Sequence, residues 1–209
     1  MVDAPDSKSG GGDTVRVRFP LPAPERSMKF CSKCGKPVTK RVPEGDNLPR
    51  YVCTACGEVH YQNPNIVAGC VAEHEGRILL CRRAIEPRKG YWTIPAGFME
   101  NDETTQQAAS REALEEALAE VEIGSLLAIV HVLHANQVHM MFRARLPRPE
   151  FGVGEESLEV SLYDENEIPW QEIAFRSVDF ALRRYLEDRR AGLEQHHFRT
   201  LDLRKLMSA

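Results

Sequence analysis

Apolar and polar residues alternate in short runs from about residue 63 onward, and the spacing of these runs predicts a mixed α/β domain. Two apolar runs, 66–72 and 77–81, flank a turn-like segment and predict a β-hairpin. The same reasoning gives three further strands and two helices. We expect strands over 121–132, 138–146 and 158–163, and helices over 103–119 and 176–189.

The two ends of the chain lack such a pattern. Residues 1–27 contain a Gly-Gly-Gly run followed by three prolines, and they offer too little apolar surface to offset the entropy lost on ordering. We therefore expect a disordered tail over 1–27 and a loose C-terminal tail over 191–209. Between them we expect a cysteine-bearing module over 28–62 and the α/β domain over 63–190.

Composition narrows the class of protein. Of 209 residues, 42% are hydrophobic and 28% charged, which is typical of a folded soluble domain. The net charge of −4 gives no overall basic surface, so we expect no nucleic-acid partner. A local basic patch is still compatible with this charge. The longest nearly apolar stretch, 126–135, is far shorter than the roughly 18 residues of a membrane span, so we expect no membrane partner.

The N-terminus shows no secretory signal, because no apolar core follows a basic start. We therefore expect a cytoplasmic protein of the bacterial type, with a plastid location as the alternative if the chain comes from a plant.

Four of the six cysteines form two C-x-x-C-G pairs separated by an 18-residue spacer. They are Cys31, Cys34, Cys53 and Cys56. Two intervening residues let both sulfurs of a pair reach one ion at about 2.3 Å, and two pairs complete a tetrahedron with no open position. The spacing predicts a structural Zn²⁺ site in a zinc ribbon. A four-thiolate iron site and a redox pair are the alternatives.

Three glutamates, Glu112, Glu115 and Glu116, lie at i, i+3 and i+4 of the expected helix and so share one face. Three clustered anions repel one another and favour a hard divalent cation, Mg²⁺ or Mn²⁺. We expect Arg111, beside them, to pair with Glu103 and fasten the preceding loop to the helix. Taken alone, the three glutamates are also compatible with a solvated surface face.

The same helix carries two further expectations. Leu114, Ala117 and Leu118 lie on roughly the opposite face from the carboxylates, where we expect them to pack into the core. Asn101 or Asp102 is expected as the N-cap.

From Gly97 onward the sequence reads G-x5-E-x7-R-E-x2-E-E, which matches the Nudix box, and the chain resembles the Nudix hydrolase family. It departs from the box at Leu118, where glycine is usual, and this departure concerns how the helix ends. The resemblance covers about residues 63–190. It implies an α/β/α sandwich with a mixed sheet, preceded by a small zinc ribbon, and hydrolysis of a nucleoside diphosphate linked to another group.

The resemblance also implies roles for individual residues. Glu112 and Glu116 would be the principal Mg²⁺ or Mn²⁺ ligands, joined by Glu115 and by the backbone carbonyl of Ala96 or Gly97. A glutamate from a later loop often completes such sites. The first candidate for this role is Glu159, and the next candidates are Glu155 and Glu156. The implied catalytic set is Glu112, Glu115, Glu116, Arg111, Glu103 and Glu159.

The substrate is expected to be a small nucleotide. Several stretches resemble the FAD or ADP-ribose pyrophosphatases of plant chloroplasts and their bacterial relatives. These stretches are 43–47, 60–64, 81–87, 95–101 and 154–160. The resemblance favours cleavage of FAD to FMN and AMP, with ADP-ribose as a further substrate. Candidates for contacts with the phosphates are Arg82 and Arg83, with Arg88 as a third. Candidates for stacking on a ring are Trp92 and Phe98, with Tyr91 and Phe142 as further ones.

Two alternatives stay open. The chain could be an NADH pyrophosphatase, although residues 120–150 lack the SQPWPFP-like motif of those enzymes. It could also be a non-catalytic nucleotide-sensing factor whose ribbon binds nucleic acid or protein. Retention of every acidic position of the box favours the enzyme. Nudix relatives often form homodimers, so a homodimer is a further expectation.

Overall fold

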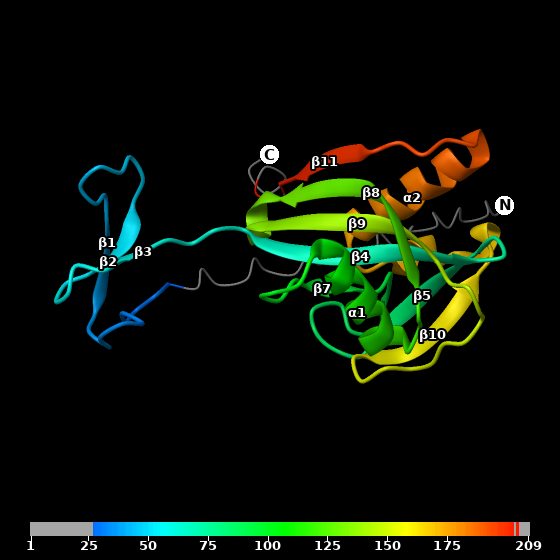
Figure 1. Cartoon of the computed structure of the whole chain (residues 1–209), viewed down its shortest axis with the longest axis horizontal. Coiled ribbons are helices and arrows are strands. Elements are labelled where there is room, and N and C mark those ends of the chain that lie inside the picture. The colour runs from blue at the N-terminus through cyan, green and yellow to red at the C-terminus, as the bar shows by residue number, and fades with distance from the viewer. Residues whose placement is uncertain (1–26, 203, 205–209) are drawn as a thin grey trace, which may run out of the picture.

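The computed structural model describes residues 27–202 and 204 of the chain. A small antiparallel sheet comes first, in the order β1-β2-β3. Its strands are β1 Val38–Arg41, β2 Arg50–Cys53 and β3 Val59–His60. Figure 1 shows this ribbon set apart from the larger domain and joined to it by the segment before β4.

The larger sheet has eight strands, in the order β10-β5-β4-β9-β8-β11, with β6 paired to β5 and β7 paired to β4. The strands are β4 Asn65–His74, β5 Arg77–Arg83, β6 Trp92–Thr93, β7 Ala96–Phe98, β8 Glu122–Val132, β9 Gln137–Arg145, β10 Ser157–Tyr163 and β11 His197–Leu201. The β4–β9 and β8–β11 pairs are parallel and the others are antiparallel. The predicted mixed sheet is therefore confirmed.

Two helices, α1 Thr105–Ala117 and α2 Arg176–Ala191, cover opposite faces of this sheet (Figure 1). Alternate residues of β5 show the division, because neighbouring side chains of a strand point to opposite faces. Ile78 and Leu80 pack with α2, whereas Leu79 and Cys81 pack with α1. The α/β/α sandwich is confirmed. Short 3-10 helices lie at Leu133–Ala135, Glu165–Glu167 and Trp170–Glu172.

The expected hairpin is present, since β4 and β5 pair antiparallel through Glu73 with Ile78 and His74 with Arg77. The three other expected strands and both expected helices also form, with ends shifted by a few residues. Within residues 27–202 and 204, no helix has the length and apolar character needed to cross a membrane.

The prediction of a loose tail from Gly192 is wrong for residues 197–201. They form β11, which pairs in parallel with β8 in a register that sets Phe198 beside Ile129. The His197 ring bonds to the carboxylate of Asp188 on α2, with nitrogen–oxygen distances of 3.0 and 3.1 Å. No periodic apolar pattern marks this strand, because its three central residues are exposed. The expected tail over 1–26 lies outside the described residues.

The N-cap of α1 is Thr104, so the prediction of Asn101 or Asp102 is wrong. The Thr104 hydroxyl accepts a hydrogen bond from the Gln107 backbone N–H at 3.2 Å, and the Gln107 side chain accepts one from the Thr104 N–H at 2.7 Å. This reciprocal capping box satisfies two N–H groups that would otherwise lack partners, which one Asn or Asp in the preceding turn does not do.

The buried face of α1 agrees with the prediction at Ala117 and differs from it at the two leucines. Leu114 and Leu118 are 49% and 54% exposed, while the helix packs on the sheet through alanines. These are Ala108, Ala109, Ala113 and Ala117. Small side chains let the helix approach the sheet closely, and this closeness carries two of its glutamates into the interior as well.

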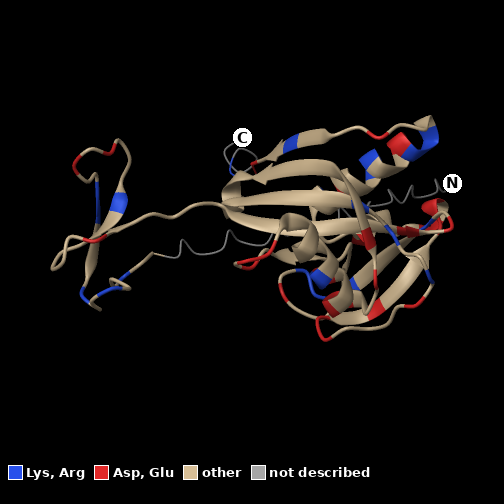
Figure 2. Ribbon diagram, viewed as in Figure 1, with Lys and Arg blue, Asp and Glu red and all other residues tan. Residues whose placement is uncertain are grey.

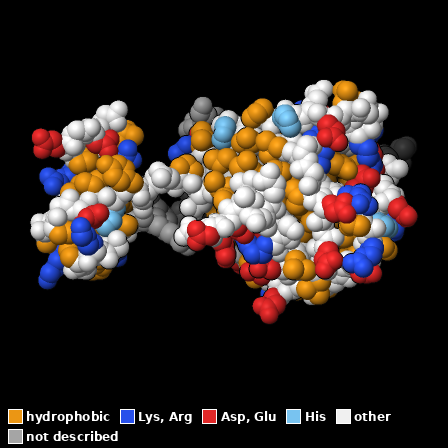
Figure 3. Space-filling model, in the orientation of Figure 1, with side chains coloured by type: hydrophobic (Ala, Val, Ile, Leu, Met, Phe, Trp, Pro, Cys, Tyr) orange, Lys and Arg blue, Asp and Glu red, His pale blue; other side chains and the backbone are white. Residues whose placement is uncertain are grey.

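Hydrophobic side chains are also exposed on the surface, both on the ribbon and on the face of the large sheet seen in Figure 3. Phe30 and Tyr61 of the ribbon are 62% and 63% exposed, and Phe198 of β11 is 67% exposed.

Candidate metal and pyrophosphate site

Helix α1 and strand β7 bring two buried carboxylates together. Glu112 and Glu116 are 8% and 5% exposed. The Ala96 backbone N–H donates to Oε2 of Glu116 at 3.2 Å. A Cβ atom added at Gly97 would lie 2.3 Å from Oε1 of Glu112, so the lack of a side chain at Gly97 leaves room for this carboxylate beside β7. The predicted grouping of Glu112, Glu116 and Gly97 is therefore present.

Burying these two carboxylates close together costs electrostatic free energy. Burial raises the pKa of Glu116 to about 8, the Ala96 N–H opposes this, and the charges of Glu112 and Glu156 add to it. Burial likewise raises the pKa of Glu112. A buried anion needs a compensating charge. Carboxylate oxygens with a nearby backbone carbonyl are the donors that Mg²⁺ or Mn²⁺ prefers, so these residues fit such an ion.

Arg111 bonds to three glutamates around the site. Its Nη1 donates to Glu112 at 2.8 Å and to Glu115 at 2.9 Å. Its Nε and Nη2 donate to the two carboxylate oxygens of Glu103 at 3.1 and 2.8 Å, and Nη2 also donates to the Phe98 carbonyl at 3.1 Å. The predicted Arg111–Glu103 pair is confirmed. In Figure 2, basic and acidic positions lie close together around α1.

Glu115 lies further out, since its side chain is 58% exposed and bonded to Arg111. Among the described residues, the four ribbon cysteines are the only group of three or more possible metal ligands whose ligand atoms all lie within 4.8 Å of one another. The three glutamates are therefore spread out rather than gathered around one point.

A loop before β10 carries Glu156, one of the expected candidates for the later glutamate. The Gly154 N–H donates to the Glu116 carbonyl at 3.2 Å, and a Cβ at Gly154 would lie 1.8 Å from the Glu115 carbonyl oxygen. On the other side, the Ala84 N–H donates to the Glu156 carbonyl at 2.8 Å. The loop is therefore held against both α1 and the end of β5, and the charge of Glu156 acts on both Glu112 and Glu116.

Glu159, the first candidate for this role, has a different charged neighbour. It is on β10 opposite Arg82, and its Oε2 lies 3.5 Å from Nη1 of Arg82. Strand register decides this outcome. The Gly-x-Gly spacing of residues 152–154 was the available signal for Glu156, because each glycine N–H meets a carbonyl of α1.

The neighbouring residues Arg82 and Arg83 have different partners. Arg82 donates to the Gly90 carbonyl at 2.9 Å and faces Glu159. Arg83 donates to the Pro87 carbonyl at 2.9 Å, and its charge acts on Glu116 to lower the pKa of that carboxyl against the effect of burial. Only Arg83 therefore faces the carboxylate cluster.

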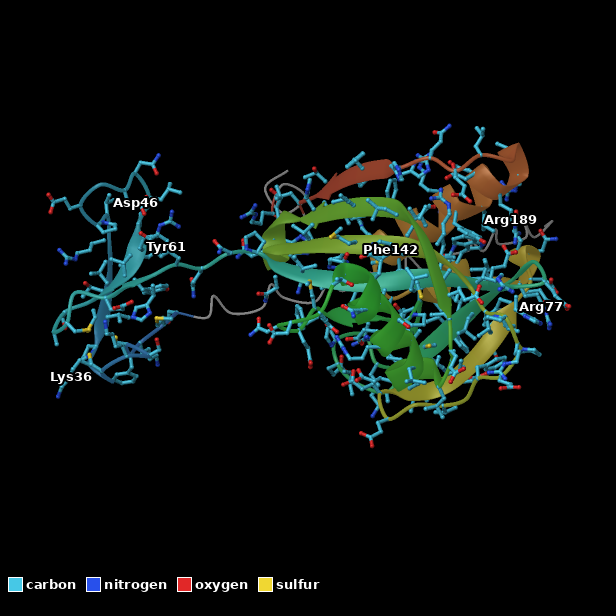
Figure 4. The ribbon with its side chains drawn as sticks, viewed as in Figure 1. Lys36, Asp46, Tyr61, Arg77, Phe142 and Arg189 are labelled. Carbon is cyan, nitrogen blue, oxygen red and sulfur yellow. The ribbon has the colours of Figure 1, made fainter. Side chains whose placement is uncertain are left out.

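The aromatic candidates differ in the same way. Trp92 is 5% exposed and meets Tyr163 edge-on at 5.1 Å, so its expected role in stacking on a substrate ring is wrong: it belongs to the core. Phe142, labelled in Figure 4, lies on β9 and is 3% exposed. Phe98 is 55% exposed next to Gly97, and Tyr91 is 37% exposed. These two rings are accessible.

The four ribbon cysteines converge as the spacing predicts. The Cys31–Cys56 and Cys34–Cys53 sulfurs are 3.8 and 3.4 Å apart. Four sulfurs at about 2.3 Å around Zn²⁺ would be about 3.8 Å apart, so the set fits this ion. The N–H groups of Cys56 and Ala55 lower the pKa of Cys53. The Lys36 N–H acts to lower the pKa of Cys34, but the neighbouring thiols raise it overall, so Cys53 is the thiolate of this pair.

Two protein-family models match the chain. The model described as "NUDIX domain" matches residues 63–184, and the zinc-ribbon model described as "Nudix N-terminal" matches residues 29–62. The chain belongs to the Nudix family. The resemblance expected from the box is thereby confirmed, and the four cysteines lie within the matched ribbon.

Solved structures and curated proteins agree with this assignment. A NUDIX hydrolase from Nitrosomonas europaea is 53% identical with a TM-score of 0.81, and the match covers 83% of this chain and 99% of that one. An ADP-ribose pyrophosphatase from Streptococcus suis, 21% identical with a TM-score of 0.54 over 65% of this chain and 99% of that one, shares the fold. The NAD-capped RNA hydrolase NudC of Salmonella heidelberg is 38% identical over 95 residues, 44% of this chain and 34% of that protein. The chain thus matches about a third of the length of this relative.

Proposed function

We propose that this Nudix protein is a metal-dependent pyrophosphatase that hydrolyses the P–O–P link of a dinucleotide, with FAD cleaved to FMN and AMP as the first candidate and ADP-ribose as the next. The observation that carries the reaction type is that two buried carboxylates of α1, Glu112 and Glu116, both lie against β7. The resemblance of residues 81–101 and 154–160 to FAD and ADP-ribose pyrophosphatases supports the substrate.

In this proposal Glu112 and Glu116 hold Mg²⁺ or Mn²⁺, with Glu115 and Glu156 beside them and the carbonyl of Ala96 or Gly97 as a further oxygen donor. When bound, the ion neutralises charge on the pyrophosphate and lowers the pKa of a coordinated water. The burial of Glu112 and Glu116 supports this role, because, of the two, Arg111 pairs only with Glu112 and a cation would offset the cost of burying both charges.

Arg111 positions the carboxylates. Because it bonds to Glu112, Glu115 and Glu103 at once, it keeps α1 and the preceding loop in one arrangement. Arg83 binds a phosphate oxygen of the substrate, since its charge acts on the same cluster.

Phe98 and Tyr91 are the rings available for an adenine or flavin. Phe98 adjoins Gly97, and its carbonyl accepts from Arg111, so its backbone is held beside the site. Base–aromatic stacking is tolerant of the base, which agrees with more than one dinucleotide substrate.

A second candidate is hydrolysis of NADH or of an NAD cap on RNA. The 38% identity with an NAD-capped RNA hydrolase over 95 residues favours it. The absence of an SQPWPFP-like motif from residues 120–150 weighs against it.

The test is a panel of equal concentrations of FAD, ADP-ribose, NADH, a 5′-NAD RNA and a nucleoside triphosphate, each with Mg²⁺ or Mn²⁺. Products are separated by chromatography, and Glu116→Gln serves as the inactive control. We expect FMN and AMP from FAD at the highest kcat/KM. Preference for NADH or the capped RNA would select the second candidate, and no turnover of any substrate would overturn the enzyme proposal.

A further inference from the structure

Arg83 is held by the chain around it. Its backbone N–H donates to the Tyr91 carbonyl at 2.9 Å, and its Nε donates to the Pro87 carbonyl at 2.9 Å. Within the part of the chain that the structure describes, its two terminal nitrogens, Nη1 and Nη2, donate to no protein acceptor. The guanidinium therefore has one edge occupied and the other edge available.

The guanidinium of Arg83 lies over the ring of Phe175. The distance from Cζ of Arg83 to the ring centroid is 5.1 Å, within the range of a cation–π contact. Phe175 is the residue just before α2, and the segment preceding it is tied to β6, because the Ala174 N–H donates to the Trp92 carbonyl at 2.8 Å. The ring is thus fixed by the sheet and by the start of the helix.

These two restraints act on different parts of the Arg83 side chain. The Pro87 carbonyl holds Nε, and the Phe175 ring holds the guanidinium carbon from one side. An arginine whose guanidinium is already held in place loses less freedom when it binds a phosphate with two nitrogens. Neighbouring Arg82 offers a contrast, since it bonds to Gly90 and faces Glu159 instead.

We propose that Phe175 is a positioning residue for pyrophosphate, holding the Arg83 guanidinium so that Nη1 and Nη2 meet phosphate oxygens beside Glu116. This rests on the proposed function for the identity of the anion. Phe175 itself does not touch the reacting atoms and acts through Arg83.

The chain offers a matched control on the same helix. Arg184 and Arg199 lie over the ring of Phe180 at 5.4 and 5.5 Å, so this phenylalanine makes the same kind of contact. Its other ring neighbour is His197 on β11, away from the carboxylate cluster. Phe180→Leu therefore removes an arginine–aromatic contact without touching Arg83.

The experiment is calorimetric titration of the full chain with inorganic pyrophosphate and Mg²⁺, for wild type, Phe175→Leu, Phe175→Tyr and Phe180→Leu. Loss of a partly exposed cation–π contact corresponds to a rise of about twofold to fivefold in Kd for Phe175→Leu. Phe175→Tyr keeps the ring and should restore binding, and Phe180→Leu should leave Kd unchanged. For a substrate that is turned over, Phe175→Leu should raise KM more than it lowers kcat.

A double-mutant cycle with Arg83→Ala separates positioning from packing. In the Arg83→Ala background, Phe175→Leu should produce no further change in Kd. An equal effect in both backgrounds, or a lower melting temperature with unchanged Kd, would overturn the proposal. If no dinucleotide is hydrolysed but the pyrophosphate results hold, the proposed function fails while the positioning role stands.

Discussion

Gly97 lies where β7 passes the carboxylate of Glu112, and Gly97→Ala tests the geometry of the proposed metal site. The added Cβ would lie 2.3–2.4 Å from all three carboxylate atoms, whereas ordinary contacts begin at 3.4 Å. The carboxylate must therefore move by about 1 Å. A displacement of about 1 Å at a reacting centre can cost about 10²-fold in rate, so we expect kcat to fall by about this factor.

The stability of the variant should change little. The group in the way is the end of a flexible side chain, so it can move without shifting backbone. We expect the free energy of unfolding to change by less than about 1 kcal/mol, since no backbone atom has to move. Circular dichroism during urea unfolding measures this, alongside steady-state hydrolysis of the best substrate of the panel.

Two glycine variants serve as controls. At Gly69 the added Cβ would meet the Pro95 carbonyl oxygen at 2.6 Å, so Gly69→Ala should destabilise the fold itself. At Gly124 the nearest atom is 3.3 Å away, so Gly124→Ala should affect neither property strongly. Near-wild-type turnover of Gly97→Ala, or a stability loss equal to that of Gly69→Ala, would refute the assignment of Glu112 to the metal site.

Four further predictions concern Glu116, Cys31 and Leu118. Glu116→Gln should lower kcat by about 10²-fold or more, because it removes a charge that holds the cation. Without added divalent metal, the free energy of unfolding of the wild type should fall as pH rises from about 4.3 toward about 8, as measured by urea unfolding. The reason is that the pKa of Glu116 is raised to about 8 in the fold, so the folded state keeps a proton that the unfolded state has lost. Glu116→Gln should show a weaker fall. Cys31→Ser should lower zinc below one per chain by elemental analysis and unfold the ribbon, while a full zinc content would contradict the ligand set. Leu118→Gly should raise the free energy of unfolding by about 1 kcal/mol. Leu118 ends α1 at φ 48°, a left-handed conformation that favours glycine. Leu118→Ala keeps Cβ and should show no such gain.

Leu118 also shows how a departure from the Nudix box is accommodated. Its N–H donates to the Leu114 carbonyl at 2.9 Å, and the Ala119 N–H donates to the Ala113 carbonyl at 3.2 Å. The Gly152 N–H, from a distant loop, donates to the Ala117 carbonyl at 2.7 Å. The helix therefore ends where the box places its end, with leucine in the glycine conformation.

Local spacing alone determined much of this protein. The two C-x-x-C-G pairs predicted the zinc ligands, and the spacing from Gly97 to Glu116 predicted the helix, its shared carboxylate face and the Arg111–Glu103 pair. These features depend on residues close together in sequence, where helix and turn geometry fixes their relative positions. For the same reason the apolar runs predicted the strands and helices of the domain.

The tertiary structure decided what depends on register and on packing between distant elements. It placed Glu156 beside the buried carboxylates and left Glu159 facing Arg82, and it turned Arg83 toward the cluster while burying Trp92. It also added β11, whose mostly exposed residues carry no apolar period. A shift of one residue in a strand moves each side chain to the opposite face of the sheet. The sequence pattern does not determine this register. Strand pairing and contacts across the sheet determine it.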